Sequence, residues 1–279
     1  IMTGLKENKV GYTLFRLGVR KPIAKAIAAK LGGKLRLMVT GGAPCDPDLL
    51  TGFNKFGVEI LEGYGLTETA PVLTFNPQHA PKPGSVGKPV PGVEIKILDA
   101  GAEGIGEIAA RGPNVMKGYF NNPEATEAVF RDGWFVTGDL GFIDADGYVT
   151  ITGRKKSLIV NREGKNIYPE EVEHHVCRSP YIREALALGY REEGEKVGEH
   201  VGVIVVPNQE AIDDLAAREK RVYSEKEVAD LLRRETKRVC ADISEYKRPR
   251  RVQVRWEEFD KTSTGKVKRY LYALGGDTE

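Results

Sequence analysis

The chain has 279 residues, of which 41% are hydrophobic and 29% are charged, so it is long enough for two globular domains with ordinary cores. Its net charge of +2 argues against a nucleic-acid partner, and no apolar run has the length of a transmembrane segment. The three cysteines are far apart and form no metal-binding or redox pattern, which favours a reducing compartment and a cytoplasmic protein.

The first 75 residues alternate between helical and strand patterns. Apolar residues recur at helical spacing over 21–31, and Pro47 opens a second helix over 47–56. Short apolar runs at 35–40 and 58–61 suit buried strands. This order of helix, strand, helix and strand predicts an α/β layer with a parallel sheet.

The middle of the chain has a different character. Five prolines between residues 77 and 91 indicate a loop-rich stretch. Apolar and polar residues then alternate over 93–98, and a second strand is expected at 106–111. This pattern predicts an antiparallel, half-exposed sheet or small barrel, followed by a short helix that begins at Asn122.

Beyond residue 152 the pattern is α+β. We expect, in chain order, a helix near 169–177, strands at 184–188 and 200–206, a long helix from Ser224, a strand at 252–256 and a final helix over 265–274. Glu227 completes a capping box with Ser224. We place the domain boundary at 153–156, which separates residues 1–152 from residues 157–279.

Four short motifs follow one another in a fixed order. They are GYGLTET at 63–69, TGD at 137–139, GRKK at 153–156 and TSTGK at 262–266. One such string is weak evidence, but four in order are strong evidence. Together they resemble the adenylate-forming superfamily, which contains acyl-CoA synthetases, luciferases and the adenylation domains of peptide synthetases.

The resemblance implies a fold that is α/β in its first part and α+β in its second. Residues 1–152 correspond to the carboxy-terminal part of the large AMP-binding domain, with an α/β layer and a small β-barrel-like part. Residues 157–279 correspond to the small mobile carboxy-terminal domain. Within the hinge at 153–156, Lys156 matches the residue about which the small domain turns between adenylation and thioester formation.

Activation of a carboxylate by ATP requires charge stabilisation at the α-phosphate. The carboxylate attacks that phosphorus and pyrophosphate leaves, so Mg²⁺, hydrogen-bond donors and a cation are needed there. The resemblance assigns catalytic roles to Lys266, which bridges the carboxylate and the α-phosphate, to Glu68, which holds Mg²⁺, and to Thr67, which contacts the α-phosphate. Carboxylate oxygen is the ligand that Mg²⁺ prefers.

The nucleotide itself contacts glycine-rich loops in this family, because backbone amides can approach phosphate where no side chain intervenes. The resemblance implies nucleotide-binding roles for Gly41, Gly42, Ala43, Glu62, Gly63, Tyr64, Thr67, Asp139 and Arg154. Asp139 would accept hydrogen bonds from the ribose hydroxyls, and Gly164 would shape the channel for the arm of coenzyme A. Taken singly, each of these motifs also reads as an ordinary surface turn.

The phosphate loop of the superfamily, which ends in Pro-Lys-Gly, occurs nowhere in the sequence. We therefore expect the chain to be the carboxy-terminal half of a longer parent and not to catalyse efficient adenylation by itself. The parent is expected to be a long-chain fatty acid–CoA ligase that uses a fatty acid, ATP and coenzyme A, and that can form a homodimer. Three alternatives stay open: an enzyme that loads a carrier protein, an aryl or short-chain acyl-CoA synthetase, and an isolated nucleotide-binding module.

Overall fold

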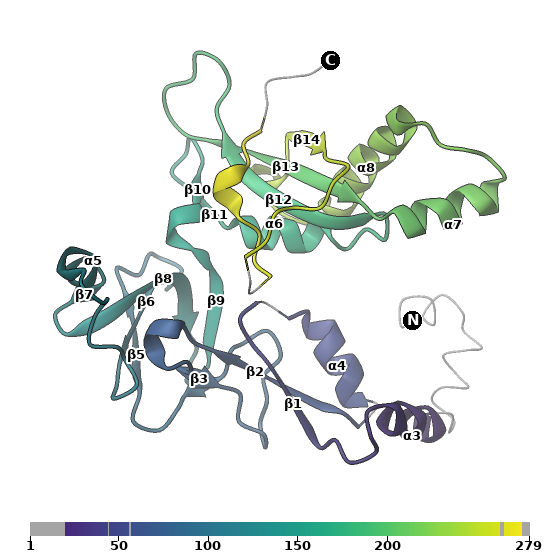
Figure 1. Cartoon of the computed structure of the whole chain (residues 1–279). Helices are drawn as coiled ribbons and strands as arrows, with labels where there is room; N and C mark the ends of the chain where they lie inside the picture. The colour runs from purple at the N-terminus through teal and green to yellow at the C-terminus, as the bar shows by residue number, and fades with distance from the viewer. Residues whose placement is uncertain (1–19, 44, 56, 263–264, 275–279) are drawn as a thin grey trace. The chain divides into compact units, whose positions relative to one another are not determined.

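The computed structural model describes residues 20–43, 45–55, 57–262 and 265–274. The chain forms two compact units, Ile1–Ile151 and Thr152–Glu279 (Figure 1). Strand β9 (Val149–Arg154) carries the chain from the first unit into the second. Each unit is described by itself below.

The first unit begins with a mixed sheet of four strands. Their order is β1 (Leu37–Thr40), β2 (Glu59–Tyr64), β3 (Thr74–Phe75) and β4 (Lys88–Pro89), preceded by α3 (Arg20–Lys30) and with α4 (Pro47–Lys55) between β1 and β2. Strands β1 and β2 are parallel, as the sequence predicted, and the other pairs are antiparallel.

Helix α4 begins where the sequence predicted, because a neighbouring side chain accepts a hydrogen bond from a backbone amide of its first turn. The side chain of Asp46 accepts a hydrogen bond from the Asp48 amide at 2.8 Å, next to a proline that cannot donate one. The apolar side of the helix packs on β2 through Leu50, which is buried against Val58 and Ile60. This contact holds α4 against β2.

The second sheet of this unit has five strands and is the predicted antiparallel part. It consists of β5 (Glu94–Leu98), β6 (Gly106–Arg111), β8 (Trp134–Ile143) and β7 (Phe130–Arg131) in that order, with β9 added on β8. Helix α5 (Pro123–Ala128) precedes β7 and is capped by Asn122, whose side chain accepts a hydrogen bond from the Ala125 amide at 3.0 Å.

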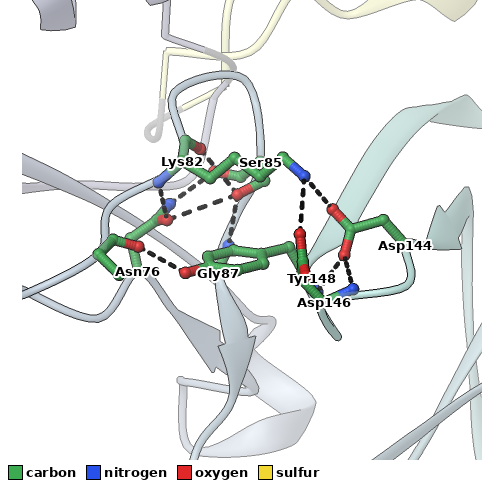
Figure 2. A network of polar contacts seen from close by, with 8 residues as sticks. Asn76, Lys82, Ser85, Gly87, Asp144, Asp146 and Tyr148 are labelled. Atoms are coloured by element: carbon green, nitrogen blue, oxygen red, sulfur yellow. Dashed lines mark hydrogen bonds and ion pairs between the residues drawn. The ribbon is translucent and has the colours of Figure 1, made fainter.

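A polar network orders the proline-rich segment between the two sheets (Figure 2). The hydroxyl of Tyr148 donates to the carbonyl of Ala80 at 2.5 Å, and Lys82 forms an ion pair with Asp144. Asn76 closes the same loop, because the backbone amide of Lys82 donates to the side-chain oxygen Oδ1 of Asn76 at 2.9 Å. A stretch that the sequence predicts only as loop is therefore fixed by side-chain hydrogen bonds and an ion pair.

The second unit is built around a sheet of three strands. These are β12 (Ile182–Tyr190), β13 (His200–Pro207) and β14 (Arg251–Val254), with a separate pair of short strands β10 (Ile159–Val160) and β11 (Asn166–Ile167) and three helices, α6 (Pro169–Val176), α7 (Gln209–Glu219) and α8 (Glu225–Val239). Strand β13 is antiparallel to β12 and parallel to β14.

Strand β13 is buried on both faces, which explains its continuous apolar sequence. One set of alternate residues packs against helices α6 and α8; it consists of Val201, Val203 and Val205. The other set, Ile204 and Val206, packs against the carboxy-terminal segment of the chain. The core of the unit thus has helices on one side and an extended segment on the other.

The predicted final helix over 265–274 is wrong. Only a short 3₁₀ turn, η5 (Arg269–Leu271), forms there, and Tyr270 is 81% exposed. Tyr272 and Leu274 pack on the sheet as alternate residues of an extended segment. Their spacing of two suits a strand-like chain.

Helices α7 and α8 show how much the sequence signal depends on burial. The predicted capping box of α8 is confirmed, since the Ser224 amide donates to the Glu227 carboxylate at 2.9 Å and the Ser224 hydroxyl accepts from the Glu227 amide at 3.4 Å. Helix α7 was not predicted, and Ile212 is its sole buried residue. None of the described helices is both long enough and apolar enough to cross a membrane.

Candidate functional site

Two glycine loops meet at one edge of the first sheet. Because β1 and β2 are parallel, the loops that follow them leave the sheet at the same edge. A Cβ atom on Gly41 would lie 2.9 Å from the carbonyl oxygen of Gly63, so this approach of the two backbones requires glycine. Gly42 follows with a φ of +81°, and Ala43 is exposed beside it. The predicted loop at 41–43 and the predicted loop at 63–69 are therefore neighbours.

Glu62 is buried beneath these loops, with 7% of its surface exposed. Burial raises the pKa of its carboxyl group, and hydrogen bonding from the backbone amides of Cys45 and Gly84 opposes the rise. Among the described residues, its Oε2 atom has no hydrogen-bond partner. The sequence pointed to Glu62 only as a neighbour of the nucleotide, and the structure shows a buried carboxyl group whose pKa is raised.

Asp139 reaches the site through a β-bulge. Three residues of β8, 137–139, oppose Ile108 alone on β6, where the register shifts. Gly138 has a φ of +74°, which a side chain would strain. The hydroxyl of Thr137 donates to the Ile108 carbonyl at 2.8 Å and accepts from the Asp139 amide at 3.1 Å. The TGD motif is thus a turn within a strand that redirects one carboxylate.

A hydrogen bond joins the two sheets at this point. The hydroxyl of Tyr64, at the end of β2, donates to Oδ2 of Asp139 on β8 at 2.6 Å. Asp139 is 5% exposed, so the bond lies largely out of water. Two motifs that are 75 residues apart in sequence therefore lie side by side.

Thr67 and Glu68 stand on a tight turn that follows β2. This 3₁₀ turn, η2 (Thr67–Thr69), is closed by Thr69, whose hydroxyl accepts from the Leu66 amide at 2.9 Å. A Cβ atom on Gly65 would lie 1.7 Å from the carbonyl oxygen of Pro71, so the turn cannot form with another residue there. Thr67 is exposed, whereas Thr69 is buried and structural.

A second loop holds the Glu68 turn in place, and sequence reasoning missed its role. The hydroxyl of Tyr119 donates to Oε1 of Glu68 at 2.9 Å, and the Met116 amide donates to the Glu68 carbonyl at 2.8 Å. The side-chain amide of Asn114 donates to the carbonyls of Thr69 at 2.9 Å and Val72 at 2.7 Å. These contacts span more than forty residues of sequence, so no local pattern could reveal them.

The geometry of Glu68 suits a carboxylate that is the one protein ligand of a magnesium ion. Its Oε1 atom accepts from Tyr119, and its Oε2 atom has no hydrogen bond among the described residues. No group of three metal-binding side chains occurs in the described part of the chain. This suits Mg²⁺, which usually takes one or two protein carboxylates and completes its shell with water and substrate phosphates.

The other predicted residues belong to the second unit. Arg154 and Lys156 are exposed, at the end of β9 and within the 3₁₀ turn η3 (Lys155–Ser157). Gly164 has a φ of +74° and lines a hollow of about 360 Å³ that also contains Arg162 and Arg191. Lys266 is exposed, and residues 263 and 264 of its motif lie outside the described residues.

Two protein-family models match the chain, one within each of its two units. The family described as AMP-binding enzyme matches residues 10–120, and the AMP-binding enzyme C-terminal domain matches residues 171–266. The chain belongs to the adenylate-forming enzymes. The family resemblance and the mixed fold expected from the sequence are both confirmed.

Relatives of this adenylate-forming chain carry the names of several acid–CoA ligases. Oxalate–CoA ligase of Arabidopsis thaliana is 37% identical over 249 residues, which is 86% of this chain and 44% of the relative. Long-chain-fatty-acid–CoA ligase of Salmonella typhimurium is 35% identical over 242 residues, or 84% of this chain and 39% of the relative. Indoleacetate–CoA ligase of Aromatoleum aromaticum is 36% identical, covering 84% of this chain and 43% of the relative.

Solved structures agree with these relatives. ATP-bound MatB from Rhodopseudomonas palustris is 33% identical with a TM-score of 0.67, over 85% of this chain and 44% of that one. O-succinylbenzoate coenzyme A synthetase from Bacillus subtilis, in complex with ATP and a magnesium ion, is 29% identical with a TM-score of 0.67, over 88% of this chain and 49% of that one. The chain spans less than half the length of these relatives.

Tyr64→Phe tests the bond between the two sheets. The variant keeps the ring but loses the hydroxyl that donates to Asp139, and we expect it to lower the free energy of unfolding of the first unit by about 1–3 kcal/mol. Urea denaturation measures this. Tyr270→Phe is the matched control, because Tyr270 is 81% exposed and should change stability by less than about 0.5 kcal/mol. Equal stability of the two variants would contradict the importance of the bond.

Glu62 should make stability depend on pH. Because its pKa is raised in the fold above the ordinary 4.5, the folded chain binds more protons than the unfolded chain as pH rises past that value. The free energy of unfolding should therefore fall as pH rises from about 4.5 through the raised pKa, and Glu62→Gln should flatten this slope. Denaturation at a series of pH values from about 4 to about 9 measures this slope. The exposed Glu103→Gln is the control. An unchanged slope in Glu62→Gln would refute the assignment.

Proposed function

We propose that the chain supplies the carboxy-terminal part of the active site of an AMP-forming acyl-CoA ligase. In the first step, the carboxylate of an acid attacks the α-phosphate of ATP, and pyrophosphate leaves. In the second step, the thiol of coenzyme A attacks the acyl carbonyl, and AMP leaves. The observation that carries this proposal is the hydrogen bond between Tyr64 and Asp139, which brings a glycine-rich loop and a buried carboxylate to one place.

The first unit would bind the nucleotide. Asp139 accepts hydrogen bonds from the ribose hydroxyls, and Tyr64 keeps its carboxylate turned toward them. The adenine lies against the backbone of Gly41, Gly42, Ala43 and Gly63, because backbone without bulky side chains can be approached closely. Thr67 offers its exposed hydroxyl to the α-phosphate. Glu62 lies under the loops, where burial raises the pKa of its carboxyl group.

Glu68 would hold Mg²⁺ through its free oxygen, and Tyr119 would fix the orientation of the carboxylate. When bound, the ion neutralises charge on the phosphate oxygens. The site then has one protein ligand and leaves the remaining positions of the ion to the substrate and water.

The second unit would supply residues that each act in only one of the two steps, adenylation or thioester formation. Lys266 places its ammonium between the carboxylate and the α-phosphate during adenylation, and Arg154 contacts the ribose or phosphates. Lys156 is the pivot of the hinge at 153–156. Gly164 borders the arm of coenzyme A, which is supported by the hollow beside it and its two arginines.

The acid is proposed to be a long-chain fatty acid. The support is the similarity to ligases named for long-chain fatty acids, among them the Salmonella typhimurium enzyme at 35% identity. Relatives named for oxalate and indoleacetate match a similar share of the chain, 86% and 84%.

The assay uses a hybrid in which residues 1–279 follow the upstream part of Rhodopseudomonas palustris MatB, which the chain matches over 44% of its length. The hybrid is incubated with ATP, Mg²⁺, coenzyme A and acids of increasing chain length, and acyl-AMP and acyl-CoA are followed by mass spectrometry. Acyl-CoA is expected. Adenylate without thioester would point instead to a carrier protein as acceptor. If the hybrid forms neither acyl-AMP nor acyl-CoA, the proposal is refuted.

Lys266→Ala in this hybrid should lower adenylate formation by about 10²- to 10³-fold, the effect of removing one group that stabilises transition-state charge. Lys237→Ala removes an exposed lysine of α8 and should leave the rate within about twofold. Equal rates of adenylate formation in the two variants would remove Lys266 from the mechanism.

A further inference from the structure

The segment that carries Lys266 is closed at its base. The Lys268 amide donates to the Asp260 carbonyl at 2.9 Å, and Lys261 and Val267 form an antiparallel bridge. Lys266 itself lies above this base and is exposed. Its position in space therefore depends on how the base is attached to the rest of the unit.

Arg269 makes the main attachment, three residues after Lys266. Its Nη2 atom lies 2.5 Å from Oε1 of Glu173 on α6, and its Nη1 atom donates to the carbonyl of Ala187 on β12 at 2.9 Å. The Ala187 amide donates back to the same Glu173 oxygen at 2.8 Å. One guanidinium thus joins a helix, a strand and the segment of Lys266.

This attachment is shielded from water. The side chains of Arg269 and Glu173 are 24% and 19% exposed, whereas those of the surface pair of Arg178 and Asp242 are 54% and 61% exposed. Burial raises the pKa of Glu173 to about 7, while the charge of Arg269 acts to lower it. The carboxylate of Glu170 lies 3.8 Å from the same guanidinium. Removing Arg269 would leave two carboxyl groups facing each other without their cation.

The other arm of the loop is attached to the same strand. Lys261 forms an ion pair with Glu184 on β12, and the Asp260 amide donates to the hydroxyl of Tyr272 at 2.7 Å. The base of the loop is therefore fastened on both sides, with Arg269 on the arm that directly follows Lys266.

Helix α6 also touches the strand that leads to the hinge. A Cβ atom on Gly153 would lie 2.7 Å from Oε2 of Glu170, so the first turn of α6 packs directly on the chain next to Arg154. One helix thus contacts both the end of β9 and, one turn further on, the anchor of the Lys266 segment.

We propose that the pair of Glu173 and Arg269 is a positioning element that fixes the base of the Lys266 segment for adenylate formation. This inference rests on the proposed function for Lys266. An ammonium on a long flexible stem arrives reproducibly only if its backbone is held, and a misplacement of about 1 Å can cost about 100-fold in rate. The thioester step does not use Lys266, so it should not need the pair.

Hydrogen exchange on the 279-residue chain tests the anchor directly. In Arg269→Gln, the amides of Lys266 and Lys268 should exchange about tenfold faster or more, while the amides of β13 keep their protection. Arg233→Gln is the control, because it removes the same charge from an exposed pair with Asp230 on α8 and should change neither. Unchanged exchange at Lys266 and Lys268 in Arg269→Gln would overturn the proposal, as would equal loss of protection throughout the unit.

The two half-reactions of the hybrid test the role in positioning. Arg269→Gln should lower ATP–pyrophosphate exchange by about tenfold or more, and transfer from supplied acyl-adenylate to coenzyme A should stay within about twofold. Glu173→Gln keeps the shape of the pair and should cause a smaller change in the same direction, and Arg269→Lys should restore part of the rate. Equal losses in both half-reactions would overturn the proposal. If the unsubstituted hybrid performs neither half-reaction, the proposed function fails, and hydrogen exchange alone decides whether the anchor exists.

Discussion

The hydrogen bond from Tyr64 to Asp139 is the contact on which the candidate site depends. It joins the mixed sheet to the antiparallel one within the first unit, and each partner is placed by a backbone feature that tolerates few substitutions. Tyr64 lies between Gly63, which faces Gly41, and Gly65, which faces Pro71. Asp139 follows a bulge that needs a positive φ at Gly138. Because Asp139 is 5% exposed, its carboxylate would lose this hydrogen bond in a place that water barely reaches.

Most of the site is made of backbone, and few side chains are exposed in it. Thr67 and Glu68 are presented by a turn that Thr69 closes from within, while Asn114 and Tyr119 hold that turn from outside. Such a site can keep its geometry while the rest of the enzyme varies.

Much of the fold could be predicted from sequence where a local rule applies. Pro47, Asn122 and Ser224 mark helix starts because capping involves neighbouring residues, and β13 reads as a strand because it is buried on both faces. The glycine motifs indicated the loops for the same reason. The prediction of a final helix was wrong because Tyr272 and Leu274 pack on a sheet whose strands are distant in sequence.

The contacts that complete the site could not be predicted. Tyr119 meets Glu68 across 51 residues, and Arg269 meets Glu173 across 96. Neither pair has a spacing or a composition that distinguishes it from the many other charged and aromatic residues of the chain. A sequence motif indicates which backbone comes close to a ligand, whereas the side chains that hold this backbone are chosen by the fold.

The most direct test of the account is calorimetry of AMP binding by the 279-residue chain and by Asp139→Asn. Asparagine keeps the size of the side chain but not its charge or its second acceptor, so binding to the ribose should weaken by about tenfold or more. Measurable heat with the natural sequence and its loss in Asp139→Asn would support the nucleotide site. No heat at millimolar AMP, or equal binding by both chains, would contradict it.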